Sequence, residues 1–180
     1  LNPIKVYTSM YKGVFGNDIR TWNSIRDLML LLCIAIGLAP AFKMRFWNIG
    51  AEGQILVGGI ATAACMIYWG DVVPTWMLLV IMVVVSMVAG ALWGIIPAVF
   101  QARWNTNETL FTLMMNYVAM QIVSFCIVFW ENPKDSNTVG VINRDTMGGW
   151  LPYLFEQKYL LNILIVAIIT IGMYIYLTYT

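Results

Sequence analysis

The chain has 180 residues, of which 61% are hydrophobic and only 11% are charged, and its mean hydropathy is +0.77. A soluble domain is about half apolar and roughly a quarter charged, so this composition excludes an ordinary soluble protein and indicates an integral membrane protein. The sequence contains no histidine, which excludes a Ser/His triad, a histidine-ligated metal and a histidine proton relay within this chain, and its net charge of +1 gives no basis for nucleic-acid binding.

Residues 1–24 alternate between polar and aromatic side chains and contain the turn-forming stretch FGND, which predicts an external interfacial segment. Asn23 or Ser24 can serve as the N-cap of the apolar run that follows. The chain begins with Leu, without the basic region of a signal peptide, and it ends inside an apolar run. We therefore expect an internal piece of a longer membrane protein, in which residues 25–180 form the membrane-spanning domain.

Five apolar runs follow, at residues 25–42, 48–69, 74–100, 109–130 and 160–180. Because a helix needs roughly 20 apolar residues to cross the hydrocarbon core, these runs predict an all-α polytopic helix bundle. The short loops around Lys43 and Arg103 are basic, whereas the loop at 70–75 has no Lys or Arg. The first two loops are therefore assigned to the cytoplasm, and residues 1–24, the 70–75 loop and the 131–159 loop to the outside.

The second run begins with the polar, glycine-rich stretch NIGAEGQ, which contains Asn48, Gly50, Glu52, Gly53 and Gln54. If it is helical, Asn48 and Glu52 share a face and Gln54 points about 200° away from Glu52, so no rotation hides all three from lipid. The two glycines permit an interrupted helix whose free N–H groups face a ligand or water, as in many transporters. The alternative is that Glu52 lies near the cytoplasmic interface, pairs with Lys43 or Arg45 and anchors the helix.

The third run contains the stretch GALWG, in which Gly90 and Gly94 have the small-xxx-small spacing that lets helices approach closely in membranes. We expect these glycines to pack against a neighbouring helix. Pro97 lacks a backbone N–H and is expected to kink the span near its end.

The fourth run is preceded by the stretch NTNET, in which Asn107 or Thr106 can cap the helix and Glu108 then lies in the first turn, where the helix dipole favours an anion. Further along, Thr109, Thr112 and Asn116 recur on one narrow face. An asparagine about two turns into a span is expected to face the bundle or a polar cavity. These residues therefore act either as interhelical contacts or as a wall of a pathway.

Two stretches, FWNIGAEGQILVGGIAT and GALWGIIPAVFQARWNTNETLFTLMMNYVA, resemble the permease subunits of bacterial ATP-binding cassette (ABC) importers for nucleosides. These permeases are often encoded beside basic membrane lipoproteins and are grouped with ribose and other simple-sugar permeases. The resemblance covers residues 25–130 and extends more loosely to residue 180. It implies a longer multi-pass subunit of the inner membrane, whose partners are a second permease subunit, two cytoplasmic ATP-binding subunits and an external substrate-binding lipoprotein.

The resemblance implies that the chain forms the pore of an importer for nucleosides, with the purine type favoured. ATP would be bound and hydrolysed by partner subunits, so the chain is expected to need no cofactor, metal or catalytic residue, and it has no GxxxxGK[ST] phosphate loop. The resemblance favours four residues as parts of the substrate pathway: Asn48, Glu52, Gln54 and Asn116. Thr112 is added to this set because it lies on the same helix face as Asn116.

Three other functions were weighed against this one. A ribose-type sugar permease is the nearest alternative. An intramembrane enzyme would need a base beside Ser86 or Ser124 or a second acid beside Glu52, and an ion channel would need rings of like charge or a carbonyl filter.

The 131–159 loop has a composition suited either to docking a binding protein or to an ordinary solvated loop.

Overall fold

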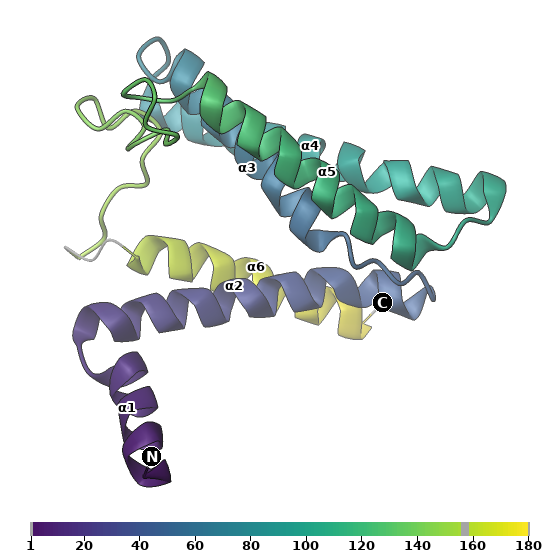
Figure 1. Ribbon diagram of the computed structural model, residues 1–180, viewed down its shortest axis with the longest axis horizontal. Coiled ribbons are helices and arrows are strands. Elements are labelled where there is room, and N and C mark those ends of the chain that lie inside the picture. The colour runs from purple at the N-terminus through teal and green to yellow at the C-terminus, as the bar shows by residue number, and fades with distance from the viewer. Residues whose placement is uncertain (1, 156–158, 180) are drawn as a thin grey trace. The chain divides into compact units, whose positions relative to one another are not determined.

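The computed structural model describes residues 2–155 and 159–179, so Leu1, Thr180 and residues 156–158 of the predicted external loop lie outside the described residues. Six helices lie in this part of the chain (Figure 1): α1 (Pro3–Phe15), α2 (Asp18–Lys43), α3 (Ala51–Trp69), α4 (Thr75–Trp104), α5 (Glu108–Phe129) and α6 (Leu160–Tyr179). Helices α2 to α6 are long and apolar enough to cross a membrane. The predicted all-α protein with five spans is confirmed.

The first span begins earlier than the sequence predicts. Helix α2 starts at Asp18, directly after the turn at Gly16 and Asn17, so Asn23 and Ser24 lie inside the helix and their predicted capping role is wrong. Asp18 lies in the first turn, where the helix dipole favours a carboxylate. Hydropathy therefore marks where the apolar part of α2 begins, and not where the helix begins.

Helix α4 also extends beyond its predicted end. It continues through the buried Pro97 to Trp104 and ends at Asn105, whose φ of 49° is left-handed. The N–H of Asn105 donates to the carbonyl of Gln101 over 2.9 Å. Asparagine tolerates this backbone conformation better than most residues, which makes it a suitable helix end.

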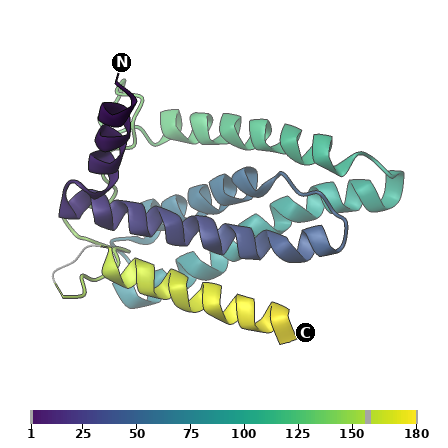
Figure 2. The ribbon, with the colours of Figure 1, turned by 90° about the horizontal axis from the view of Figure 1, so that it is seen from below.

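The chain divides into two compact units: the segment up to Pro40 together with the segment from Leu151 onward, and residues Ala41–Trp150. In the first unit, α6 lies alongside α2 in both views (Figure 1 and Figure 2). The Arg26 guanidinium lies 5.2 Å from the centroid of the Tyr159 ring and also pairs with Asp27 over 2.8 Å. The Arg26–Tyr159 contact joins the first part of α2 to the residue that precedes α6.

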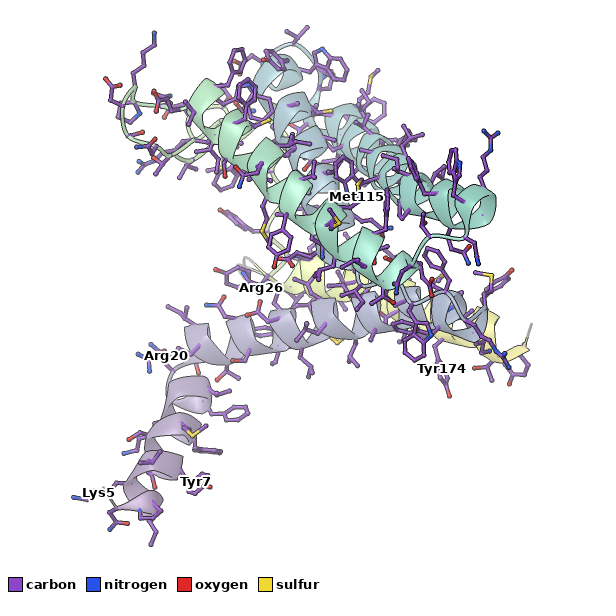
Figure 3. All side chains as sticks on the ribbon, turned by 45° about the vertical axis from the view of Figure 1, so that its right-hand side comes forward. Lys5, Tyr7, Arg20, Arg26, Met115 and Tyr174 are labelled. Carbon is purple, nitrogen blue, oxygen red and sulfur yellow. The ribbon has the colours of Figure 1, made fainter. Side chains whose placement is uncertain are left out.

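Helix α1, in the same unit, is amphipathic. Ile4, Tyr7, Tyr11 and Phe15 recur at helical spacing, and Lys5 and Lys12 lie on a different face. Figure 3 shows Lys5 and Tyr7 projecting from different sides of α1. All described side chains of α1 are exposed. This pattern is typical of helices that lie at a membrane surface, and the interfacial placement of residues 1–24 stays a prediction.

In the second unit, α3 packs against both α4 and α5. Small residues allow the close approach of α3 and α4: an added Cβ at Gly58 would lie 3.4 Å from the carbonyl oxygen of Ser86, and one at Gly90 would lie 3.5 Å from that of Gln54. The side chain of Gln54 also lies against Gly94. In this unit Gly90 and Gly94 therefore lie at the α3 contact, as their spacing predicts.

The loop between α5 and residue 150 folds back onto the end of α3. The side-chain amide of Asn143 donates to the carbonyl oxygens of Met66 (2.7 Å) and Gly148 (3.1 Å). The Trp130 indole N–H donates to the Tyr68 hydroxyl over 3.1 Å. Gly149 has a φ of +79° and lies against the side chain of Met66, a position that favours glycine. Residues 131–150 and the α3–α4 turn consequently lie at the same end of the second unit.

Candidate functional site

The predicted site begins where α3 begins. The helical path is interrupted at residues 44–50, and α3 starts at Ala51 with Gly50 as its N-cap, so Gly53 lies inside the helix and outside the interruption. The buried Asn48 accepts the N–H of Gly50 at Oδ1 over 2.8 Å and so closes a local turn ahead of the helix. We refer to residues 48–54 as the α3 start.

Two side chains of α5 hold the α3 start. Thr112 and Asn116, here called the α5 pair, are 0% and 4% exposed. The Thr112 hydroxyl accepts the N–H of Ile49 over 3.2 Å. The Asn116 carboxamide accepts the N–H of Gly53 over 2.9 Å and donates to the carbonyl of Ile49 over 3.0 Å. Asn116 thus satisfies one of the N–H groups that every helix start leaves without an intrahelical partner.

The two glycines of the α3 start make this contact sterically feasible. A Cβ at Gly50 would lie 2.9 Å from Asn48 Oδ1 and 3.1 Å from Thr112 Cβ. A Cβ at Gly53 would lie 2.8 Å from Asn116 Oδ1 and 3.0 Å from Trp93 Nε1. A larger residue at either position would make these neighbouring side chains shift and would loosen the contact between the helices.

The three polar side chains of the α3 start point in different directions. Asn48 is buried and lies before the helix, while Glu52 is exposed in its first turn. The shared face of these two residues was conditional on a helix from residue 48, and that condition is not met. Gln54 is half-buried against α4. The predicted opposition of Glu52 and Gln54 matches this arrangement.

Glu52 forms no ion pair with the basic side chains that the structure describes. Within residues 2–155 and 159–179, no basic side chain lies within 4.0 Å of its carboxylate. The alternative in which Glu52 pairs with Lys43 or Arg45 is therefore not seen in the described chain. Glu52 keeps an exposed carboxylate beside the N-terminal end of a helix, where the dipole favours a negative charge.

The start of α5 is capped by Asn107. Its Oδ1 accepts the N–H of Leu110 over 3.1 Å, and Glu108 lies in the first turn. The Thr106 hydroxyl oxygen is buried without a partner among the described residues, so of the two predicted alternatives Asn107 is the cap.

One residue that contacts the α3 start was not predicted from the sequence. The indole nitrogen of Trp93 is buried without a hydrogen-bond partner in the described chain, and it lies against Gly53. Its position between Ala91 and Gly94 in GALWG was the available signal, because a large ring beside small residues on a packing face must reach the neighbouring helix. Gly53 therefore lies between Trp93 of α4 and Asn116 of α5.

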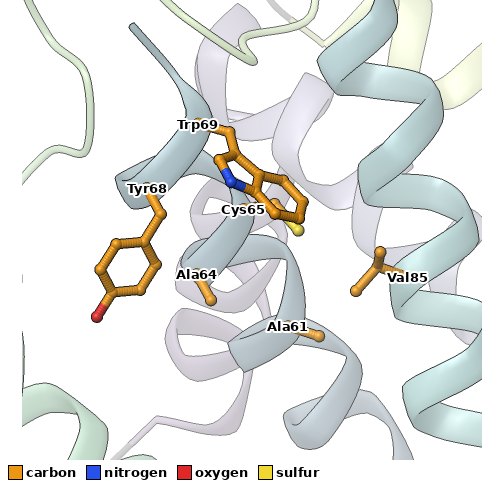
Figure 4. Close-up of a pocket in the computed structure, with 6 residues that line it drawn as sticks. All are labelled: Ala61, Ala64, Cys65, Tyr68, Trp69 and Val85. Carbon is orange, nitrogen blue, oxygen red and sulfur yellow. The ribbon is translucent and has the colours of Figure 1, made fainter. Parts of the chain in front are cut away.

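A groove of about 380 Å³ lies further along α3 (Figure 4). The residues that line it are Ala61, Ala64, Cys65, Tyr68, Trp69 and Val85. Figure 4 shows Val85 projecting from α4 towards α3. The lining is apolar apart from the tips of Tyr68 and Trp69, so the groove suits an apolar side chain or acyl chain better than a polar molecule.

Comparison with known proteins identifies the class of this membrane protein. Residues 7–180 match the family model described as branched-chain amino acid transport system / permease component. Because the match covers nearly the whole chain, the chain belongs to this permease family. With its five apolar helices it is a multi-pass membrane protein. No solved structure matches it.

Three curated relatives with this similarity are all permease proteins of ABC transporters. The chain is 33% identical over 121 residues to the guanosine ABC transporter permease protein NupP of Bacillus subtilis, covering 67% of this chain and 34% of the relative. It is 27% identical over 177 residues to the nucleoside ABC transporter permease protein NupB of Lactococcus lactis, covering 94% of this chain and 48% of the relative. It is 28% identical over 130 residues to the glucose ABC transporter permease protein TsgB13 of Haloferax volcanii, covering 71% of this chain and 33% of the relative. The matched region is thus less than half of each relative.

Proposed function

We propose that the chain forms part of the membrane pore of an ATP-driven importer that carries nucleosides across the bacterial inner membrane. The observation that carries this proposal is the alignment of 94% of the chain to a nucleoside ABC transporter permease. The similarity to a guanosine ABC transporter permease favours a purine nucleoside within that class.

The pore needs partners to work. In the proposed importer, ATP is bound and hydrolysed by cytoplasmic ATP-binding subunits, as the ABC permease relatives suggest, and this chain binds no cofactor of its own. A second permease subunit and an external substrate-binding lipoprotein complete the proposed importer. The second subunit encloses the pathway, and the lipoprotein delivers the nucleoside.

The α3 start is the proposed part of the substrate pathway. Glu52 is exposed there, and its carboxylate accepts hydrogen bonds from ribose hydroxyls. Among the described residues, no hydrogen bond occupies the N–H groups of Ala51 and Glu52, which are donors at the positive end of the α3 dipole. A nucleoside is neutral, polar on its sugar and flat on its base, so amide and backbone groups suit it. Asn48 and Gln54 complete the polar side chains of the proposed set, and Thr112 and Asn116 belong to it through the backbone groups of the α3 start that they bind.

A simple-sugar permease is the second candidate function. The similarity to a glucose ABC transporter permease over 71% of this chain favours it specifically. Ribose is also the polar half of a nucleoside, so the same hydroxyl-binding groups serve both substrates. The two candidates differ in whether the base is required.

The test is ATP-dependent uptake into vesicles that contain the complete protein and its partner subunits. Radiolabelled adenosine, guanosine, uridine, ribose and glucose are compared. Nucleoside uptake that unlabelled ribose does not inhibit supports the proposal. If only ribose or glucose is taken up, the substrate is a simple sugar and not a nucleoside. If a fully assembled complex shows no ATP-dependent uptake, the transport function is refuted.

The role of Glu52 is tested in the same vesicles. The Glu52→Gln variant keeps the size of the side chain and removes its charge, and Asp71→Asn does the same to an exposed carboxylate in the α3–α4 turn. We expect Glu52→Gln to reduce uptake without reducing the amount of assembled protein, and Asp71→Asn to have no effect. If both variants behave alike, Glu52 is not part of the pathway.

A further inference from the structure

The α5 pair has its hydrogen-bonding groups committed to the backbone of the α3 start. Both ends of the Asn116 carboxamide are used, one by the N–H of Gly53 and the other by the carbonyl of Ile49. The Thr112 hydroxyl accepts from Ile49 and donates to the carbonyl of Thr109 over 3.1 Å. Both side chains are also buried within the second unit. Because both side chains are buried, a substrate could reach them only if the contact between α5 and the α3 start opened.

We propose that Thr112 and Asn116 are positioning residues, which set the geometry of the substrate pathway through the α3 backbone without touching the substrate. Their contacts, at Ile49 and Gly53, lie on either side of Ala51 and Glu52. Hydrogen bonds on each side of this turn fix the direction of its free N–H groups and the position of the backbone that carries Glu52. This inference rests on the proposed transport function and assigns separate tasks to the residues of its site.

The surrounding packing makes the positioning rigid. Gly53 has Asn116 on one helix and Trp93 on another, so close that an added Cβ would make one of these neighbours shift. Gly50 is packed in the same way against the side chain of Thr112, which lies 3.1 Å from an added Cβ. The α3 start therefore cannot shift relative to α5 without breaking the hydrogen bonds or separating the helices. A displacement of α5 would carry the Glu52 turn with it.

Positioning and direct contact predict different transport phenotypes. A side chain that contacts the substrate changes the relative uptake of different nucleosides when it is altered, because each nucleoside loses a different interaction. A positioning residue alters the whole turn, so uptake of adenosine, guanosine and uridine falls by one common factor. We expect this factor to be about threefold to tenfold, because that is the change in an equilibrium that corresponds to losing one interhelical hydrogen bond in a membrane.

Matched variants of Thr112 isolate the hydroxyl. Thr112→Val keeps the volume and removes the acceptor for Ile49, whereas Thr112→Ser keeps the acceptor. The control is Thr170→Val on α6, because Thr170 is also buried and its hydroxyl donates to the carbonyl of Val166 in its own helix. We expect Thr112→Val to lower uptake of all three nucleosides by the common factor, and Thr112→Ser and Thr170→Val to retain uptake.

A second readout does not depend on transport. Ile49 is 48% exposed, so a cysteine at this position can be labelled by a maleimide in a variant in which Cys33, Cys65 and Cys126 are replaced by alanine. Loss of the Thr112 hydroxyl should raise the labelling rate at position 49 by about threefold to tenfold, because the turn opens more often. A cysteine at Trp69, at the opposite end of α3, should be labelled at an unchanged rate.

The outcomes separate this inference from the proposed function. A uniform loss of uptake together with faster labelling at position 49 supports positioning. An altered ratio of nucleoside uptake, or unchanged labelling at position 49, overturns it. If the unaltered complex takes up no nucleoside, the transport proposal fails and the labelling result still decides whether Thr112 fixes the turn. Thr112→Ala replaces Thr112→Val if the latter is lost from the membrane.

Discussion

Replacing Gly53 by alanine tests the contact between α3, α4 and α5 with the smallest available change. The added methyl group would lie 2.8 Å from Asn116 Oδ1 and 3.3 Å from Asn116 Cα. The oxygen belongs to a side chain that can move, but only by giving up its bond to the Gly53 N–H. The Cα belongs to the backbone of α5, so relieving that contact requires the helix to shift.

The expected cost is the sum of three contributions. Overpacking a close contact costs about 1–3 kcal/mol. Loss of the Asn116 hydrogen bond adds about 1 kcal/mol, and the better helix propensity of alanine offsets about 1 kcal/mol. The net destabilisation of Gly53→Ala is therefore about 1–3 kcal/mol.

Gly59→Ala is the matched control, because it lies on the same helix and an added Cβ there meets nothing within 4 Å. It should leave stability unchanged or raise it by up to about 1 kcal/mol through helix propensity. The assay is thermal unfolding of the complete protein in detergent, followed by intrinsic fluorescence, with both variants purified identically. A Gly53→Ala midpoint equal to or above that of Gly59→Ala would refute the close three-helix contact.

Three further predictions concern other contacts of the second unit. Gly94→Leu should destabilise the protein by about 1–3 kcal/mol in the same thermal assay, because the new side chain takes the space of Gln54; an unchanged midpoint would count against this packing. Asn107→Ala should cost about 1 kcal/mol by removing the α5 cap, and a loss too small to detect would mean that another group caps the helix. Asn143→Ala should speed protease cleavage within residues 131–150, measured by limited proteolysis, because two carbonyl contacts are lost; an unchanged cleavage rate would show that Asn143 does not hold the loop.

The number and order of the spans could be predicted because each depends only on a local run of apolar residues. Their ends could not be predicted equally well. Helix α2 extends into the polar residues before 25, where hydropathy gives no signal, and the capping residues Asn23 and Ser24 suggested a start that the turn at Gly16 had already supplied. Helix α4 likewise continues beyond the predicted end of its apolar run at residue 100, through Gln101 and Arg103 to Trp104, where hydropathy gives no signal.

The site residues were found because polar groups are rare in apolar runs, but their partners were not found. Sequence periodicity placed Thr112 and Asn116 on one face of α5, yet it carries no information about which helix that face meets. The partners lie 63 to 67 residues away along the chain. The burial of Asn48 and the exposure of Glu52 also depend on where α3 begins, and the sequence left open whether residues 48–54 are helical or interrupted. The role of Trp93 depends on the same non-local contact.

The separation between α3 and the α5 pair has a consequence for biosynthesis. A ribosome makes the chain from its N-terminal side, so α3 and α4 leave it before Thr112 and Asn116 exist. During that interval the N–H groups of Ile49 and Gly53 lack their α5 acceptors, and only the turn closed by Asn48 supports the helix end. The α3–α4 pair can form early through its glycine contacts, whereas the first turn of α3 acquires its final geometry only when α5 has been inserted. Variants of the α5 pair should therefore affect a late step of membrane assembly and leave the insertion of α3 and α4 intact.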